Sequence, residues 1–166
     1  MINLRNLEFL AYEFRKALEL VVDERLYGRL TIFRSFPNGC CRYTSDLLAE
    51  YLMSKGIPKE CIQMIECETI EEGYTHCWLI VKNTFYVDIS ADQFNRKAYF
   101  EKYEPIPSCC VVPCETNYLY ECFDCRKMQY LDNVGIDSYN GDIPMKLQIV
   151  YDEVVQRIEN NTEEER

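Results

Sequence analysis

From residue 75 to residue 89 the chain reads THCWLIVKNTFYVDI. Two runs within this stretch, residues 76–81 and 85–89, are mostly apolar, β-branched or aromatic, and Lys82-Asn83 between them is a turn signal. The pattern predicts two neighbouring antiparallel strands joined by a tight turn. Residues 62–68 have the same character and predict a third strand of that sheet.

The length of the turn determines which residues of this hairpin share a face. A three-residue turn at residues 81–83 places His76 opposite Asp88, so that one face is apolar and the other carries polar and aromatic residues. A two-residue turn at Lys82-Asn83 would put His76 and Asp88 on opposite faces and mix core residues with polar ones. We therefore expect the three-residue turn, with Asn83 in the left-handed conformation that it tolerates. The expected pairs are His76 with Asp88, Cys77 with Val87, Trp78 with Tyr86, and Leu79 with Phe85.

Amphipathic helices are predicted on both sides of the strands, because apolar residues recur there at spacings of three and four. The second helix begins near Cys41, directly after the turn formers of residues 37–39, and ends at Gly56. The expected fold is α+β, with N-terminal helices packed on an antiparallel sheet and a closing C-terminal helix. The periodic runs are residues 4–22, 43–55 and 144–158, and further patterns predict a strand at residues 106–112 and a short helix at residues 118–130.

Length and composition favour a single domain, residues 1–158, followed by a polar tail, residues 159–166, that frays. The chain has 166 residues, of which 48% are hydrophobic and 28% charged, so it is neither a disordered chain nor a membrane bundle.

Its net charge of −10 repels nucleic-acid phosphates and anionic lipid, which argues against nucleic-acid and membrane-surface roles. No apolar run approaches the roughly 20 residues of a membrane span, and the N-terminus has no export-signal pattern. We therefore expect a cytoplasmic location, where the ten cysteines stay reduced.

A cysteine, a histidine and an aspartate occupy positions that suit thiol chemistry. Cys40 or Cys41 lies where a turn enters a helix, and the unpaired amides and dipole of a helix N-terminus favour a thiolate. His76 is the one histidine of the chain, so any imidazole base must be this residue. Asp88, across the hairpin, would fix the tautomer of His76 and stabilise the imidazolium that forms when a thiol proton is taken.

The same residues carry a resemblance to a known family. The matching blocks are FPNGCC at residues 36–41 with Ser45 and Leu48, HCW at residues 76–78, and VDISADQF at residues 87–94. They resemble the Cys, His-x-Trp and Asp blocks of the transglutaminase-like branch of the papain-like fold, which includes transglutaminase-like peptidases, the leader peptidases of lasso-peptide maturation, and several bacterial amidases and effectors. The resemblance covers residues 36–94, roughly a third of the chain. The cysteine-rich residues 109–125 have no counterpart in it.

In that family the nucleophile opens a helix after a glycine turn, so the resemblance places it at Cys41, with His76 as the base and Asp88 as the orienting acid. The implied reaction is acyl transfer: the thiolate attacks a carboxamide or ester carbonyl, the histidine protonates the leaving group, and water or an amine resolves the thioester. The implied enzyme is a peptidase or an amidase/deamidase, with transglutaminase-type amine transfer as an alternative. The oxyanion would be held by the Cys41 backbone amide and a second donor. Candidates around the triad are Asn38 or Gln93 as that donor, Trp78 flanking the cleft or packing over the histidine, and Cys40 as the competing nucleophile.

These residues also have purely structural interpretations. A cysteine at a helix start is often a small core residue, a strand histidine is often a satisfied core residue, and Asp88 could simply end a strand. The alternative function is therefore a catalytically inactive or zinc-stabilised protein-interaction module. An enzyme would act on a peptide or protein substrate, and the acidic residues 66–72 would either form a solvated hairpin edge or prefer a basic partner.

A second group of cysteines lies between residues 109 and 125. Cys122 and Cys125 have the spacing of half a zinc knuckle, and with Cys110 and Cys114 they could close a tetrahedral structural zinc site. The same cysteines also fit a buried strand and one face of a helix, so reduced core thiols and disulfide pairing are the other interpretations. We favour reduced thiols, and the expected chemistry requires no cofactor.

Overall fold

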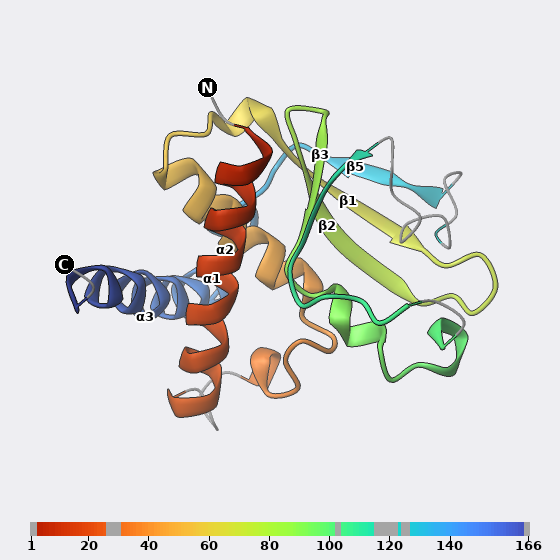
Figure 1. Ribbon diagram of the computed structural model, residues 1–166, viewed down its shortest axis with the longest axis horizontal. Helices are drawn as coiled ribbons and strands as arrows, with labels where there is room; N and C mark the ends of the chain where they lie inside the picture. The colour runs from red at the N-terminus through yellow and green to blue at the C-terminus, as the bar shows by residue number, and fades with distance from the viewer. Residues whose placement is uncertain (1–2, 26–30, 102–103, 115–122, 124–126, 165–166) are drawn as a thin grey trace.

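The structure, a computed structural model, describes residues 3–25, 31–101, 104–114, 123 and 127–164. Over this part of the chain the fold is α+β, as predicted, with a five-stranded antiparallel sheet and three long helices gathered on one side of it (Figure 1). The elements are α1 (Leu4–Arg25), α2 (Cys41–Ser54), β1 (Ile62–Glu68), β2 (Thr75–Val81), β3 (Phe85–Asp88), the short 3₁₀ helix η3 (Ala91–Phe94), β4 (Cys110–Pro113), β5 (Gln129–Leu131) and α3 (Ile143–Glu164).

The strands lie in the order β4-β3-β2-β1-β5, and each neighbouring pair is antiparallel. β1 pairs with the whole of β2, from Ile62 opposite Val81 to Glu68 opposite Thr75. The pairs between β2 and β3 cover only Leu79 to Val81 of the central strand. The first residues of β2 therefore extend past β3, and this end of the strand is where α2 begins to contact the sheet.

The predicted register of the β2–β3 hairpin is wrong by two residues, although the predicted faces are right. Leu79 lies opposite Val87 rather than Phe85, because the connecting loop is residues 82–84 rather than 81–83. Val81 is fully buried and stays in the ladder, and its carbonyl accepts a hydrogen bond from the Thr84 amide. Lys82 shares the left-handed conformation predicted for Asn83, with φ of 55° and 52°. A shift of two residues preserves the alternation of faces, so His76 and Asp88 still share a face but are not directly opposite each other.

Three other predicted boundaries differ from the structure. The strand predicted at residues 106–112 is shorter and later, as β4. The predicted helix at residues 118–130 is wrong at its C-terminal end, where β5 begins, and residues 118–122 and 124–126 lie outside the described residues. The polar tail predicted to fray from residue 159 continues α3 to Glu164, because helical hydrogen bonds propagate readily through residues such as Glu without any need for burial.

Two hydrophobic clusters lie on the two faces of the sheet. The larger fills the space between the sheet and the three helices, with Leu48, Leu79 and Val150 fully buried within it. The smaller covers the opposite face and contains Trp78 and Phe94. Within the described residues, none of the helices combines the length and apolarity that a bilayer crossing demands.

Candidate active site

Cys41 is the first residue of α2, as the turn-to-helix pattern predicted. This residue is half-buried, and its thiol is close enough to Cys77 and His76 of β2 for each of them to change its pKa. The hydrogen bond with the Cys77 thiol lowers the pKa of Cys41, burial opposes this effect, and the hydrogen bond and charge of His76 add to it, so that the pKa falls to about 4. At neutral pH Cys41 is therefore the ionised member of this group.

The shared proton resides on Cys77 for two structural reasons. Cys77 is only 4% exposed, and its Sγ lies 3.7 Å from Oε2 of Glu66, so a second negative charge there would be both desolvated and repelled. The hydrogen bond to Cys41 and burial together raise the pKa of Cys77. Cys41, by contrast, lies at the positive end of a helix dipole.

Cys40 occupies a different environment from its neighbour. Its side chain is 1% exposed, and its Sγ lies 3.3 Å from the carbonyl oxygen of Pro37. Burial, followed by the nearby charge of Cys41, raises the pKa of Cys40 to about 12. A buried protonated thiol is a poor nucleophile, so the geometry favours Cys41 over its competitor.

His76 and Asp88 are joined by a short hydrogen bond across the β2–β3 hairpin. His76 Nε2 lies 2.6 Å from Asp88 Oδ2, and both side chains are almost completely buried. The other carboxylate oxygen accepts hydrogen bonds from the Ser90 amide at 2.9 Å and the Ser90 hydroxyl at 3.3 Å. Burial alone would lower the pKa of His76, but the charge of Asp88, their hydrogen bond and the contact with Cys41 together raise it to about 10. This arrangement favours a thiolate–imidazolium pair.

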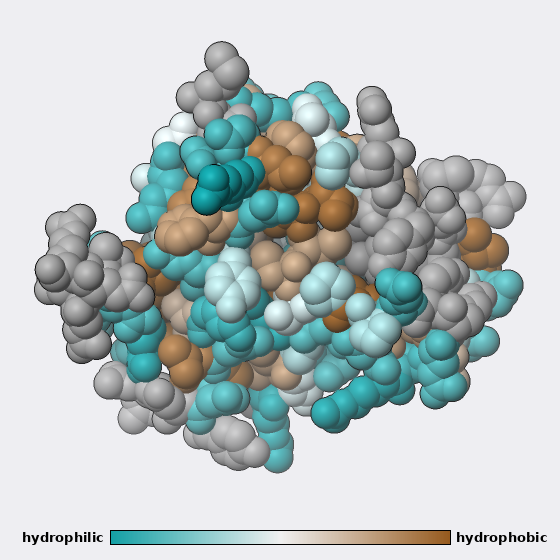
Figure 2. Space-filling model, in the orientation of Figure 1, coloured by the Kyte–Doolittle hydropathy of each residue, from teal (hydrophilic) through white to brown (hydrophobic). Residues whose placement is uncertain are grey.

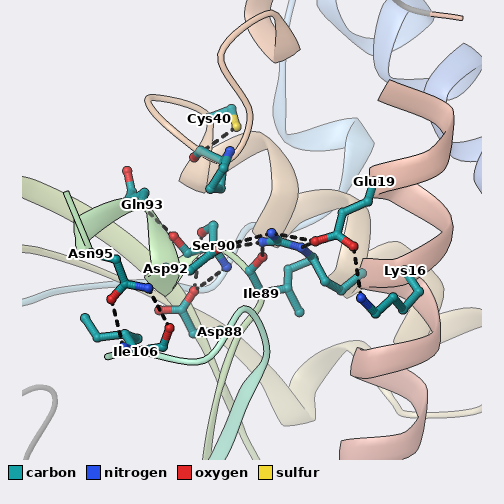
Figure 3. A network of polar contacts seen from close by, with 12 residues as sticks. Lys16, Glu19, Cys40, Asp88, Ile89, Ser90, Asp92, Gln93, Asn95 and Ile106 are labelled. Carbon is teal, nitrogen blue, oxygen red and sulfur yellow. Dashed lines mark hydrogen bonds and ion pairs between the residues drawn. The ribbon is translucent and has the colours of Figure 1, made fainter. Parts of the chain in front are cut away.

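Gln93 contacts the other nitrogen of the same imidazole ring. Its Nε2 lies 3.0 Å from His76 Nδ1. The same nitrogen donates a 3.0 Å hydrogen bond to the carbonyl of Ser90 (Figure 3). The Ser90 carbonyl can only accept, which identifies this Gln93 atom as the amide nitrogen. Neutral His76 therefore accepts a hydrogen bond from Gln93 at Nδ1, whereas in the protonated ring Nδ1 carries its own hydrogen and can only donate. When the ring is neutral both amide hydrogens of Gln93 are engaged, so Gln93 then acts on the imidazole rather than as a vacant oxyanion donor.

Aromatic rings enclose the imidazole on the face of the sheet away from α2. The ring centroids of Trp78, Phe94 and Phe123 lie 5.6, 5.0 and 5.8 Å from that of His76. Trp78 is fully buried, so of its two predicted roles it packs beside the histidine and does not line an open cleft. These rings exclude water from the imidazole and hold its plane.

Asn38, the other candidate oxyanion donor, is not brought to the triad. It is an exposed residue of the turn before α2, and among the described contacts its backbone amide donates to the Ser35 carbonyl at 2.7 Å. We find no side-chain hydrogen bond of Asn38 within the described part of the chain. The Cys41 backbone amide, at the first position of α2, has no intrahelical acceptor and remains the better placed donor.

A buried arginine of α1 holds the segment that follows Asp88. Arg15 forms a two-point ion pair with Asp92, at 3.0 and 2.9 Å, and also donates to the carbonyl of Ile89 (Figure 3). Its guanidinium lies 4.4 Å from the centroid of the Phe36 ring, in the turn before the nucleophile. Arg15 therefore connects the loop that precedes Cys41 with the segment that follows Asp88.

Two of the four predicted zinc ligands lie outside the described residues. Cys122 and Cys125 are among the positions that the structure does not describe, whereas Cys110 lies in β4 and Cys114 directly follows it. No group of three potential metal ligands gathers within the described ranges. The zinc hypothesis therefore stays a prediction.

The two main cavities of the described surface do not contain the Cys41 thiol. The larger, of about 490 Å³, lies between the N-terminal half of α1 and β4, where Figure 2 shows apolar side chains at the surface. The smaller, of about 290 Å³, is lined by residues of β1 and its neighbours, including Glu66. Because Glu66 also contacts Cys77, the smaller cavity is the one nearer the thiol.

Several residues of the site were not singled out from the sequence. Cys77, Ser90, Phe94 and Arg15 each contact the triad or its supporting loops. Ser90 had a local signature, because a residue two positions after Asp is where that carboxylate commonly accepts a backbone hydrogen bond. The others depend on contacts between distant segments.

Comparisons with known protein families, with curated proteins and with solved structures find no match to this chain.

Proposed function

We propose that this protein is a thiol-dependent acyl-transfer enzyme, a peptidase or an amidase/deamidase of papain-like or transglutaminase-like type. The observation that supports this most strongly is the 2.6 Å hydrogen bond between His76 and Asp88, together with the proximity of Cys41 to the same imidazole. The three residues come from α2, β2 and β3, so the tertiary fold assembles a nucleophile, a base and an orienting acid.

The reaction begins when the Cys41 thiolate attacks the carbonyl carbon of a bound amide or ester. The sulfur–carbon bond forms, and the carbonyl oxygen becomes an oxyanion that accepts a hydrogen bond from the Cys41 amide at the start of α2. His76 then passes its Nδ1 proton to the leaving amine as the carbon–nitrogen bond breaks, which leaves a thioester. Water deprotonated by His76 resolves the thioester, and an amine in place of water would give transfer instead of hydrolysis.

The proposed substrate is a peptide or protein, since the thiol lies at the surface end of α2 and β2. A preference for a basic substrate gains little support from Glu66, because its carboxylate lies 3.3 Å from the Arg42 guanidinium and part of its charge is offset. The neighbouring Glu68 is likewise paired with Lys127 at 3.1 Å. Shape rather than charge would therefore select the substrate at this edge.

The pH dependence of thiol alkylation tests the proposal without a known substrate. At about pH 5.5 an ordinary thiol, with a pKa of about 8.5, is ionised in only about one molecule in a thousand. Cys41, with a pKa of about 4, remains a thiolate at this pH. We expect iodoacetamide to modify Cys41 at least about tenfold faster than any other cysteine at this pH, even after allowing for the lower nucleophilicity of a weakly basic thiolate. Peptide mapping by mass spectrometry identifies the modified residue.

Three variants complete this experiment. The C40S variant should keep the rapid alkylation, C41S should lose it, and H76A should slow it because the imidazolium that stabilises the thiolate is gone. Circular dichroism establishes that each variant is folded. If Cys41 in the wild-type protein reacts no faster than the other cysteines, or if H76A leaves its rate unchanged, the enzyme proposal is wrong and the inactive interaction module is favoured.

A further inference from the structure

The mechanism above makes no use of the Cys77 thiol, although Cys77 and the proposed nucleophile are close enough to change each other's pKa. Cys77 is 4% exposed, so it cannot meet a bulky reagent from solution directly. Cys41 is partly exposed and does meet solvent. The pair therefore combines one accessible thiolate with one protected thiol in contact with it.

Contacts on both sides of the pair hold the two sulfurs together. Ser45, one helical turn after Cys41, lies on the same face of α2 and donates from Oγ to the carbonyl of Cys77 at 3.4 Å. Arg42, the residue after Cys41, lies 3.3 Å from Oε2 of Glu66, the same atom that lies 3.7 Å from the Cys77 sulfur. The approach of the sulfurs thus follows from the docking of α2 on β2 and does not depend on one side-chain rotamer.

A proton acceptor for Cys77 is also present. Oε2 of Glu66, on the neighbouring strand β1, lies 3.7 Å from the Cys77 sulfur. The carboxylate is 36% exposed, so it can exchange the proton with solvent. Cys77 is consequently placed to lose its proton at the moment when it forms a bond to another sulfur.

We propose that Cys41 and Cys77 are an oxidation-sensitive pair that closes to a reversible disulfide when the protein meets a hydroperoxide. Closure blocks the nucleophile and protects it from irreversible oxidation. The inference rests on the proposed function, because it requires Cys41 to be the reactive thiolate.

The chemistry proceeds in two balanced steps. The Cys41 thiolate attacks one peroxide oxygen, the sulfur–oxygen bond forms as the oxygen–oxygen bond breaks, and hydroxide leaves, which gives a sulfenic acid on Cys41. Cys77 then transfers its proton to Glu66 and attacks the Cys41 sulfur, and the sulfur–sulfur bond forms as hydroxide departs. After protonation of both hydroxides, two thiols and one hydrogen peroxide have become a disulfide and two waters. A dithiol reductant reverses the change.

Cys40 is the competing partner and is less well placed. It is adjacent to Cys41 in the chain, but its sulfur is directed to the Pro37 carbonyl. A C40S variant is therefore the matched control, since it removes a neighbouring thiol and leaves the pair of Cys41 and Cys77 intact.

The experiment treats the reduced full-length protein with one equivalent of hydrogen peroxide and maps its peptides under non-reducing conditions. We expect a peptide pair that links Cys41 to Cys77, with a mass about 2 Da below the sum of the two reduced peptides. Alkylation of Cys41 at about pH 5.5 should fall at least about tenfold and return after treatment with dithiothreitol. The C40S control should give the same linkage and the same recovery.

The C77S and C77A variants provide the complementary measurement. Without the resolving thiol and with an excess of peroxide, two equivalents should oxidise Cys41 to the sulfinic acid, about 32 Da heavier than the thiol, and dithiothreitol should no longer restore alkylation, whereas wild type under the same excess should recover. If Cys41 is alkylated rapidly but peroxide produces no link between residues 41 and 77, this inference is wrong and the proposed function stands. If Cys41 is not rapidly alkylated in the reduced protein, the proposed function itself fails. Recovery in C77S equal to that of wild type would also overturn the inference.

Discussion

The imidazole of His76 has three kinds of neighbour, and each controls a different property of the ring. The Asp88 carboxylate, 2.6 Å from Nε2, supplies the negative charge that keeps the ring protonated. Gln93 contacts Nδ1 and sets its orientation when the ring is neutral. The surrounding aromatic rings exclude water, which strengthens both polar contacts by lowering the local dielectric.

Replacement of Asp88 by asparagine should therefore weaken the ion pair more than the fold. With the carboxylate charge gone, the pKa of His76 falls, the thiolate loses its positive partner, and the pKa of Cys41 rises by about one to three. The alkylation rate of wild-type Cys41 should stay constant as the pH falls towards about 4, whereas that of D88N should begin to decline at correspondingly higher pH. The measurement is the alkylation rate of Cys41 between about pH 4 and 9.

The D92N variant is the matched control for this change. Asp92 is a nearby carboxylate that pairs with Arg15 rather than with His76, so its loss should leave the alkylation profile near that of wild type. Superimposable profiles for D88N and wild type would show that Asp88 does not set the charge of His76.

The N-terminal half of α2 is held by polar contacts as well as by leucines. Near its N-terminus Ser45 binds the carbonyl of Cys77. One residue further on, the buried Asp46 carboxylate accepts hydrogen bonds from the Gly135 amide at 2.8 Å and the Tyr139 hydroxyl at 2.6 Å. Gly135 adopts φ +95°, and a Cβ there would approach the Glu50 carboxylate to 2.7 Å. Glycine is therefore the residue that suits this position, where the loop before α3 packs against α2. Asp46 thereby ties the nucleophile helix to the loop that precedes α3.

The charge on Asp46 should cost stability at neutral pH. Burial raises the pKa of Asp46 to about 6, despite its hydrogen bonds, from a reference value of 3.8. A carboxyl group whose pKa is higher in the folded than in the unfolded protein stabilises the fold at pH values below its unfolded pKa. This stabilisation is lost as the pH rises through the folded pKa. In D46N, whose amide oxygen can still accept from Gly135, the penalty is absent. The free energy of unfolding of wild type relative to D46N should therefore fall by about 3 kcal/mol as the pH rises from below 4 to above 6.

Urea unfolding of both proteins at a series of pH values provides this measurement. The variant D137N is the control, because Asp137 is an exposed residue of the same region and its replacement should not change the pH dependence. A constant difference between wild type and D46N across this range would contradict the assignment.

These elements could be predicted from the sequence to different degrees. The periodic runs of α1, α2 and α3 were sufficient to predict the helices, because each buries one long apolar face. The short edge strands β4 and β5 were misplaced, because a strand of three or four residues carries little periodic information and depends on its partner. The hairpin register was shifted because it depends on whether Val81 joins the turn or the core, which only the packing decides.

At the scale of the whole molecule, the sheet separates two hydrophobic cores that differ in size and in their contacts with His76. The larger cluster between the sheet and the helices supplies most of the buried apolar surface. The smaller cluster on the other face surrounds the imidazole through Trp78, Phe94 and Phe123. The proposed nucleophile, Cys41, lies at the start of α2, near the point where Ser45 of this helix contacts Cys77 of β2.

Alanine substitutions in the two cores should consequently have separable effects. L147A removes a fully buried side chain of α3 in the larger core and should lower the free energy of unfolding by about 2–5 kcal/mol without changing the pH profile of Cys41 alkylation. F94A removes the ring that meets His76 edge-on, and it should also shift the alkylation profile because water gains access to the imidazole. Denaturant unfolding and alkylation kinetics on the same samples measure both quantities, and an unchanged profile in F94A would contradict the role given to the aromatic enclosure.

What the sequence determined here is local or periodic in origin. Apolar spacing predicted the helices, the turn formers before Cys41 predicted the start of α2, and the alternation of the hairpin placed His76 and Asp88 on one face. A single histidine left no choice of imidazole. These inferences hold because helix phase, turn chemistry and strand alternation depend on residues within a few positions of one another.

Only the tertiary structure distinguished the environments of the two thiols and revealed the contacts around His76 and Asp88. Cys40 and Cys41 have nearly the same sequence surroundings. Cys40 is nevertheless buried with its sulfur against the Pro37 carbonyl, whereas Cys41 lies close to His76 and Cys77. Gln93, Arg15 and Asp46 likewise acquire their roles from partners far away in the chain. Charge and pKa depend on burial and on distances of a few ångströms between such segments, and the order of residues along the chain does not specify those distances.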